Sequence, residues 1–180
     1  MLRGKNVLLR PVEQADLSLL VSWRNEPETW ACFFNKVPLS QNGQQSWFKA
    51  LSEDRQRILF IIESLNSHEA IGTIGFDRLD HPNQVAELGN VLIGPASFKH
   101  KGFAREATML LLSYGFERLN LNRIFLNVHA GNSAAIKLYK SCGFQEEGCL
   151  RQAFFDEGVF KDILVMANLR THFRERKLTI

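Results

Sequence analysis

The sequence predicts an α+β protein, within the broad α/β class, whose mixed and mostly antiparallel sheet has about seven strands flanked by about four helices. Three observations support this fold. Apolar segments of strand length are separated by short turns in the middle and at the end of the chain. A strand, a helix and a second strand follow one another within residues 85–130, and such a crossover requires parallel pairing. The 180 residues are 45% hydrophobic and contain no repeat, linker or low-complexity segment, so we expect one domain over residues 1–180.

The N-terminal part of the chain predicts one strand followed by two helices. Residues 5–10 are an apolar segment that ends before a proline, as strands commonly do. Apolar residues recur at helical spacing over residues 13–24, and the sequence NEP at 25–27 interrupts them. Ser40 is a suitable N-cap for a second helix that we expect over residues 40–51.

The rest of the chain predicts six strands and two helices. The apolar segments 57–65, 70–79 and 85–93 form an antiparallel meander with short turns. A helix to about Leu119 is followed by a strand and by a second helix that ends at Gly143. The expected strands after the meander are 122–130, 146–155 and 159–169, the last two being joined by a turn at residues 156–158.

Composition excludes several classes of protein. No apolar segment approaches the roughly 18 residues of a membrane-spanning helix, and charged residues interrupt the N-terminal segment where a signal peptide would need an apolar core. Three cysteines without CxxC spacing are typical of reduced thiols, so we expect a cytoplasmic location. The five histidines show no metal-ligand spacing, and a net charge of +3 is too small to indicate nucleic-acid binding, so we expect no metal and no nucleic-acid or membrane partner.

The segment SFKHKGFAREA at residues 97–107 predicts an anion site at a helix N-terminus. The first N–H groups of a helix have no partner within the helix, and with the helix dipole they attract phosphate. Gly102 would allow close approach of a pyrophosphate, and basic side chains would add charge. The expected contacts are Lys99, His100, Lys101, Gly102, Phe103, Ala104 and Arg105. A solvated basic helix start is the alternative interpretation of this segment.

Two motifs resemble the GNAT superfamily of acetyl-CoA-dependent N-acetyltransferases. The pattern (Q/R)xxGx(G/A), which binds the coenzyme A pyrophosphate in that family, corresponds to residues 99–104. The pattern NxxAxxLYxxxGF corresponds to Asn132, Ala135, Leu138, Tyr139, Gly143 and Phe144. The resemblance implies a GNAT fold and transfer of an acetyl group from acetyl-CoA to a primary amine, directly within a ternary complex. A non-catalytic coenzyme A-binding sensor or assembly module is the alternative.

The resemblance also suggests how residues on two neighbouring elements act. Tyr139 would protonate the departing thiolate, since a phenol keeps its proton at neutral pH; packing in the core is the alternative. Glu87 would act as the base, directly or through a water. An ordinary ion pair is the alternative role of Glu87. If strand alternation is unbroken, Val91 lies on the same face of the strand as Glu87. The remaining coenzyme contacts are expected from the backbone of Val91, Leu92 and Ile93 and from Asn132 and Lys137.

Three departures from the family pattern concern the coenzyme loop and the strand before it, and one of them is the segment from Pro95 to Gly102, which has one residue more than the common form. The family usually has a second glycine where His100 stands, and histidine is one of the side chains that tolerates a left-handed conformation. The segment AELGNVLIGP also has one residue more than its usual counterpart, which predicts a bulge in that strand.

The acceptor amine is open between three classes. The branch resembles ribosomal-protein N-terminal, polyamine and nucleotide-amino-sugar acetyltransferases, so the candidates are an amino-sugar nucleotide, spermidine or another polyamine, and a protein or peptide N-terminus. An aromatic-rich N-terminal segment supplies the expected acceptor contacts Arg24, Trp30, Phe33, Phe34 and Trp47. Packing of the first two helices onto the sheet is the alternative role of the aromatic residues. His129 could act as a base, although a single histidine on a strand is more often structural. A homo-oligomer is possible.

Overall fold

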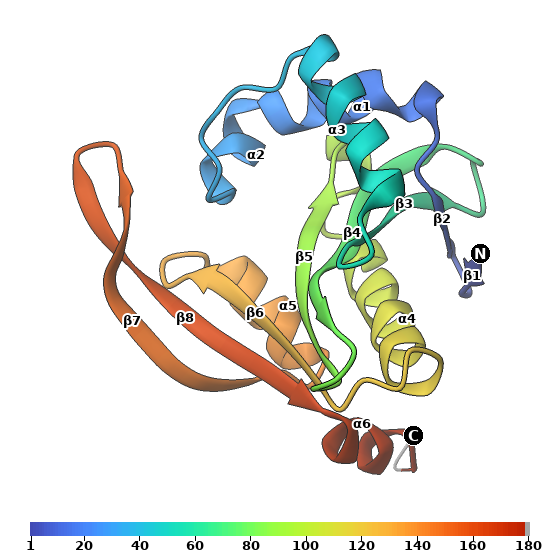
Figure 1. The fold of residues 1–180 in the computed structure, drawn as a ribbon, viewed down its shortest axis with the longest axis vertical. Coiled ribbons are helices and arrows are strands. Elements are labelled where there is room, and N and C mark those ends of the chain that lie inside the picture. Colours follow the sequence, from blue (N-terminus) through green and yellow to red (C-terminus); the bar gives the residue numbers. More distant parts are fainter. Residues whose placement is uncertain (179–180) are drawn as a thin grey trace.

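The computed structural model describes the backbone of residues 1–178 and the side chains of residues 1–174. Within this part of the chain, eight strands form one sheet in the order β1-β2-β3-β4-β5-β6-β8-β7 (Figure 1). Their bounds are Leu2–Arg3 for β1, Val7–Pro11 for β2, Ile58–Ser64 for β3, Ala70–Asp80 for β4, Val85–Ile93 for β5, Arg123–His129 for β6, Gln145–Asp156 for β7 and Val159–Leu169 for β8.

Six α-helices are described over the same residues. They are α1 (Leu17–Asn25), α2 (Pro27–Cys32), α3 (Gln41–Glu53), α4 (Phe103–Glu117), α5 (Ser133–Ser141) and α6 (Arg170–Leu178), together with the short 3-10 helices η1 (Gln14–Asp16) and η2 (Ala96–Phe98). The sequence therefore placed the main elements but undercounted them. It missed α6, which is too polar to show an apolar stripe. It missed β1, which has two residues, and it missed α2, because proline is tolerated in the first turn of a new helix.

One pair of strands in the sheet is parallel. β5 and β6, joined through α4, pair from Val85 with Arg123 to Glu87 with Phe125. The other neighbouring pairs described are antiparallel. This confirms the expected mixed sheet. Because parallel pairing covers three residues of β5, the two strands diverge beyond Glu87, and the sheet opens in its middle (Figure 1).

Helices cover the two faces of the sheet. The larger core cluster packs α4 and α5 against the sheet, with Ile124, Leu126 and Val128 of β6 turned toward them as the alternation predicted. A smaller cluster joins Leu17, Leu20 and Trp23 of η1–α1 to Ile61 and Leu92, and α3 packs on it.

A bulge interrupts β5 at Asn90, in the strand where the extra residue predicted one. The register with β4 shifts there, and Asn90 has a φ of +57°. Ala86 and Leu88 lie in the larger core, whereas beyond the bulge Leu92 lies in the smaller one. The expectation that Glu87 and Val91 share a face is therefore wrong, because the bulge reverses the alternation.

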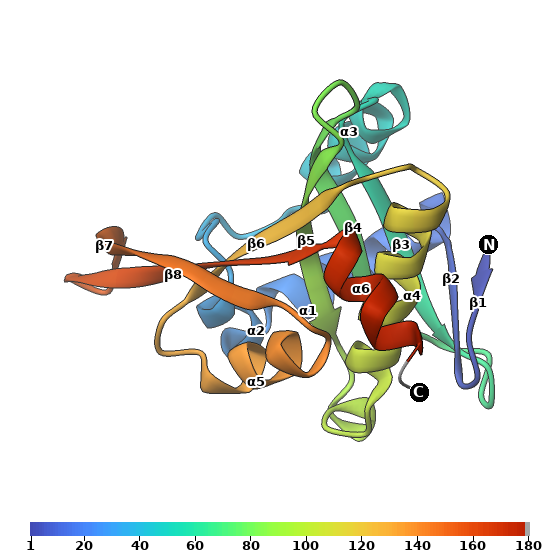
Figure 2. The same ribbon diagram turned by 90° about the horizontal axis from the view of Figure 1, so that it is seen from below.

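The β7–β8 hairpin extends away from the helices (Figures 1 and 2). Its turn lies at residues 156–158 as predicted, with positive φ at Glu157 and Gly158. β7 is an edge strand and most of its residues are exposed.

Candidate active site

The loop before α4 has the conformation expected of an anion site. Gly102 is the N-cap of α4 with a φ of +87°, and nothing lies within 4 Å of where a side chain would begin there. The first helical hydrogen bond in this turn runs from the Glu106 N–H to the Gly102 carbonyl. The N–H groups of residues 103–105 therefore precede the helical ladder and are oriented toward the open space beside Gly102.

His100 adopts the left-handed conformation that the family gives to glycine. Its φ is +60°, so the loop forms without the second glycine. Edge-to-face packing of Phe98 on Phe103, with ring centroids 5.5 Å apart, holds η2 against the start of α4. Lys101 and Arg105 are exposed, whereas Lys99 is half-buried and forms an ion pair with Glu28 of α2 at 3.3 Å. Lys99 thus connects this loop to α2.

The last residues of β5 border the opening in the sheet. Leu92 and Ile93 pair with Thr73 and Gly72 of β4. Pairing with β6 stops at Glu87, so the edge of β5 that faces β6 is open from there to Ile93. Backbone groups along this edge are available to an extended ligand that enters between the two strands.

α5 begins and ends with the residues of the second motif. The Asn132 side-chain oxygen accepts a hydrogen bond from the Ala135 N–H at 3.0 Å, so it caps the helix. Lys137 is exposed on α5. Tyr139 packs against the core and edge-to-face on Phe144, with ring centroids 5.8 Å apart.

The phenol of Tyr139 is held protonated. Burial raises its pKa above the ordinary value, and Cys142 and Cys32 raise it further. A protonated phenol at the edge of the core can donate a proton or a hydrogen bond.

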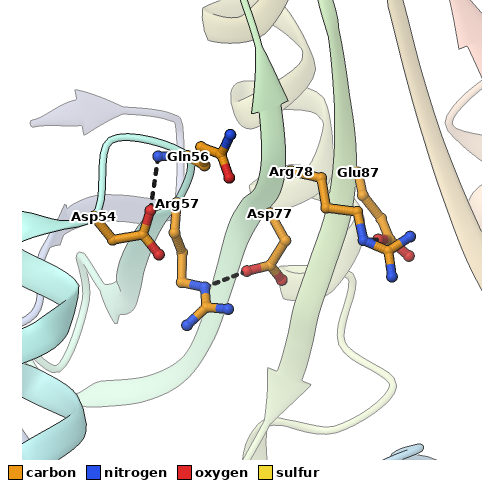
Figure 3. Close-up of a pocket in the computed structure, with 6 residues that line it drawn as sticks. All are labelled: Asp54, Gln56, Arg57, Asp77, Arg78 and Glu87. Atoms are coloured by element: carbon orange, nitrogen blue, oxygen red, sulfur yellow. Dashed lines mark hydrogen bonds and ion pairs between the residues drawn. The ribbon is translucent and has the colours of Figure 1, made fainter.

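Glu87 lies in a polar pocket on the sheet face that carries α1 and α3. One carboxylate oxygen accepts a hydrogen bond from Asn127 of β6 at 2.8 Å, and the other lies 3.3 Å from Nε of Arg78. The pocket has a volume of about 280 Å³ and is lined by Asp54, Gln56, Arg57, Asp77, Arg78 and Glu87 (Figure 3). Arg57 pairs with Asp77 across it at 2.6 Å. The ion pair expected as an alternative for Glu87 is therefore present, beside a cavity that a small polar group can enter.

Four of the five predicted acceptor residues belong to two contact groups that are joined through the chain at Phe33 and Phe34, and we call these groups together the aromatic wall. It consists of Arg24, Trp30, Phe33, Phe34, Lys36, His129 and Phe154. The Arg24 guanidinium lies 3.4 Å from the centre of the Phe33 ring. Phe34 packs on His129 and Phe154, with ring centroids 4.4 and 5.3 Å away. Trp47 packs α3 onto the smaller core, and Phe33 also packs on that core, which is the alternative that the sequence left open for these aromatic residues.

The contacts of His129 favour a packing role over that of a base. Its ring is enclosed by Phe34 and Phe154, and burial, followed by the charge of Lys36, lowers its pKa. The neutral ring does not pair with a carboxylate, so a general base role has no support in its contacts.

Sequence reasoning missed Lys36, Phe154, Asn127 and Arg78. Lys36 forms an ion pair with Asp156 at the hairpin turn at 3.2 Å, and its ammonium lies 5.5 Å from the centre of the Phe154 ring. These partners are far apart in the chain, so no local pattern could indicate the contact. Strand alternation placed Asn127 opposite the core-facing residues of β6, but it gave no sign that Glu87 would be the partner.

Neither a metal cluster nor a membrane span is found in the described residues. These residues contain no group of three or more histidine, cysteine or acidic side chains placed to hold a metal ion. No helix among them is long and apolar enough to cross a membrane.

The mixed sheet opens beside a helix start whose first N–H groups are unpaired within the helix, which is the arrangement that the two motifs led us to expect. The family model of the GNAT acetyltransferase domain matches residues 6–145, and the chain belongs to this family. It is therefore in the class of acetyl-CoA-dependent N-acetyltransferases, as its motifs implied.

Two bacterial proteins show how far the similarity extends. The uncharacterized N-acetyltransferase p20 of Bacillus licheniformis is 34% identical over 94% of this chain and 96% of its own length. The crystal structure of spermidine N-acetyltransferase from Vibrio cholerae in complex with CoA and spermine superposes with a TM-score of 0.88 at 27% identity, covering 95% of this chain and 99% of that one. A dodecameric structure of the Vibrio enzyme in an intermediate state gives a TM-score of 0.82 at 27% identity, covering 96% and 99% of the two chains.

Proposed function

We propose that residues 1–180 act as one N-acetyltransferase domain that moves an acetyl group from acetyl-CoA directly to a primary amine within a ternary complex. The observation that carries this proposal is the start of α4 beside the open edge of β5. Gly102 leaves the N–H groups of residues 103–105 accessible to a diphosphate, and Lys101 and Arg105 add positive charge. An arm attached to that diphosphate would follow the backbone of Val91, Leu92 and Ile93.

Acetyl-CoA supplies the acetyl group as a thioester, and the protein positions the amine and handles two protons. The amine must be neutral to attack, and Glu87, oriented by Asn127, would accept its proton directly or through a water. As the carbon–nitrogen bond forms and the carbon–sulfur bond breaks, Tyr139 would donate a proton to the departing sulfur. The raised pKa of Tyr139 keeps that proton in place until it is needed.

The acceptor enters from the face opposite α4 and α5. Glu87 and its polar pocket lie on that face, and the aromatic wall borders it at the ends of α1 and β6. A related enzyme acts on spermidine, and the sequence adds amino-sugar nucleotides and peptide N-termini as candidates. A cytoplasmic location remains part of the proposal.

We also propose that the chain assembles as a homo-oligomer through the β7–β8 hairpin. Leu150, Phe155, Val159 and Phe160 are apolar and at least half exposed on this hairpin, and the rings of Phe155 and Phe160 pack on each other. A related enzyme forms a dodecamer.

The test is release of free thiol from acetyl-CoA with a panel of amines that includes a nucleotide amino sugar, spermidine and a basic peptide. We expect turnover with at least one class, and we expect Glu87→Gln to lower kcat for that amine by about 10²-fold. If coenzyme A binds and no amine releases thiol, the sensor interpretation replaces this one.

A further inference from the structure

Unpartnered polar atoms are concentrated in the aromatic wall. Among the described residues, five buried side-chain nitrogen or oxygen atoms have no hydrogen-bond partner, and four of them belong to this wall. They are one terminal nitrogen of Arg24, the indole nitrogen of Trp30 and both ring nitrogens of His129. A buried polar group without a partner destabilises the protein, so four such atoms within this wall indicate that a ligand supplies the missing partners.

The wall adjoins the proposed transfer site. Trp23, next to Arg24, lies against Gly94 at the end of β5 so closely that a side chain at position 94 would collide with the indole. Glu28 of α2 pairs with Lys99 of the coenzyme loop. A molecule that reaches Arg24 can therefore also reach the opening between β5 and β6.

The charge of the wall does not suit a polycation. Burial alone lowers the pKa of Arg24 to about 10, because no acidic neighbour compensates its loss of water. Two acidic groups beside the wall already have cationic partners: Asp156 pairs with Lys36 and Lys161, and Glu28 pairs with Lys99. A polyamine would need unpaired carboxylates, whereas this surface offers an unpaired guanidinium.

We propose that the aromatic wall binds an anionic group, phosphate or carboxylate, carried by the amine acceptor, with Arg24 as its main contact. The inference rests on the proposed acetyltransferase function and names the class of its acceptor. The guanidinium stacks on Phe33 through one face, and one of its terminal nitrogens is buried without a partner within the protein, so an anion that enters beside it would supply that partner. Trp30 can donate a further hydrogen bond from its indole nitrogen. These two contacts would favour an amine that carries an anionic group over spermidine.

The experiment compares matched pairs of amines that differ by one anionic group. Glucosamine 6-phosphate is set against glucosamine, phosphoethanolamine against ethanolamine, and β-alanine against its amide, with spermidine as the polycation. In the wild-type enzyme we expect the anionic member of at least one pair to have a kcat/KM at least tenfold above its parent. Comparing the two phosphate pairs with the carboxylate pair shows which of the two anionic groups the site binds. Equal values within every pair, or a preference for spermidine, would overturn the proposal without a variant being made.

Arg24→Gln tests the assigned contact. We expect the ratio of kcat/KM between the anionic and the parent amine to fall at least tenfold, while coenzyme A affinity stays within twofold. Arg55→Gln, an exposed arginine in the turn after α3, is the control and should leave the ratio unchanged. A loss of coenzyme affinity with an unchanged ratio would assign Arg24 to the coenzyme instead.

Direct binding separates this inference from the function on which it rests. If no amine is acetylated, calorimetric titration with phosphoethanolamine and β-alanine still reports on the wall. Binding that Arg24→Gln weakens at least tenfold would support an anion site in a protein that is not an acetyltransferase of these amines. Absence of binding to the wild-type protein, together with absence of turnover, would remove the site as well.

Discussion

Single residues with positive φ shape the coenzyme loop and the strand beside it. His100 and Gly102 turn the chain so that α4 begins with its N–H groups exposed, and Asn90 inserts the bulge that places Glu87 and Val91 on opposite faces. Asparagine and histidine tolerate this conformation better than most residues. The sequence indicated a left-handed His100 and a bulge in β5, because a histidine stands where the family usually has glycine and because the strand segment has one residue more than its usual counterpart. It did not predict that the Asn132 oxygen would be used to cap α5, since its motif gives the residue type and not its hydrogen bonds.

His100→Val tests the left-handed residue. A β-branched side chain is strained at positive φ, so we expect a loss of about 1–3 kcal/mol in the free energy of unfolding and weaker coenzyme A binding. His100→Gly should keep coenzyme affinity. His68→Val is the matched control, because His68 also has positive φ, at +56°, but lies in the turn between β3 and β4. It should lose stability without losing coenzyme affinity. Thermal melts and coenzyme titration measure both quantities; full affinity in His100→Val would contradict the role of this residue.

Tyr139→Phe tests the proton donor. The ring and its packing on Phe144 remain, so we expect near-native stability and coenzyme affinity, with kcat reduced on the order of 10²-fold. Tyr114→Phe is the control, because Tyr114 is also half-buried and packs edge-to-face on Phe60. Steady-state kinetics of both variants distinguish the two tyrosines. Full activity of the Tyr139→Phe enzyme would mean that Tyr139 is not the proton donor and serves in packing alone.

At the scale of elements, the spacing of apolar residues and the glycine and turn residues that end helices and strands predicted most of the fold. The apolar alternation of β6, the glycines at the start of α4 and after α5, and the turn of the β7–β8 hairpin all lie where the sequence placed them. α6 was not predictable from an apolar pattern, because the helix is polar and Phe173 is the residue through which it packs on the core. The aromatic segment was recognised, but its pairing with the hairpin depends on the Lys36–Asp156 contact between distant elements.

The start of α1 is fixed by an acid-sensitive ion pair. Asp16 is 4% exposed, and Arg10 of β2 binds both of its carboxylate oxygens at 2.8 Å. Burial would raise the pKa of Asp16, but the hydrogen bonds from Arg10 and from the Glu13 N–H lower it. A lowered pKa in the folded state means that Asp16 stabilises the protein above its unfolded pKa of about 3.9 and that this contribution is lost as pH falls further.

Asp16→Asn should therefore destabilise the protein in a pH-dependent way. At pH 7 we expect a loss of about 1.5–3 kcal/mol, because the charged hydrogen bonds to Arg10 are weakened. The difference from wild type should narrow as pH falls below about 4, because the carboxylate of the unfolded chain takes up a proton at a higher pH than the native one does. Urea unfolding at several pH values measures this. A difference that stays constant down to pH 2.5 would mean that the ionised form of Asp16 is not what stabilises the junction.

At the scale of the whole molecule, the β7–β8 hairpin carries apolar residues that the chain itself leaves exposed, although Phe34 and Lys36 contact its turn region. It extends beyond the helices in both views, and its apolar residues are exposed (Figures 1 and 2). Alternation in the sequence gave the two strands and their turn, but it could not show that they project from the body, because that depends on where β6 ends and on what packs beside β8.

Phe155→Ser combined with Phe160→Ser should reduce the oligomeric state, because a second copy would bury these rings. Light scattering after size-exclusion chromatography should give a lower mass for this variant than for the wild type. Val37→Ser, which changes an apolar residue that is 67% exposed outside the hairpin, is the control and should leave the mass unchanged. A wild-type protein that is monomeric at high concentration would contradict the assembly proposal.

The central claim is that the N-terminus of α4 receives the diphosphate of coenzyme A and directs its acyl end toward Tyr139. A crystal structure of the protein with coenzyme A tests this most directly. We predict that the diphosphate oxygens lie within hydrogen-bonding distance of the N–H groups of residues 103–105, with the thiol near the Tyr139 hydroxyl. A coenzyme bound with its diphosphate at any other place on the protein would contradict the account.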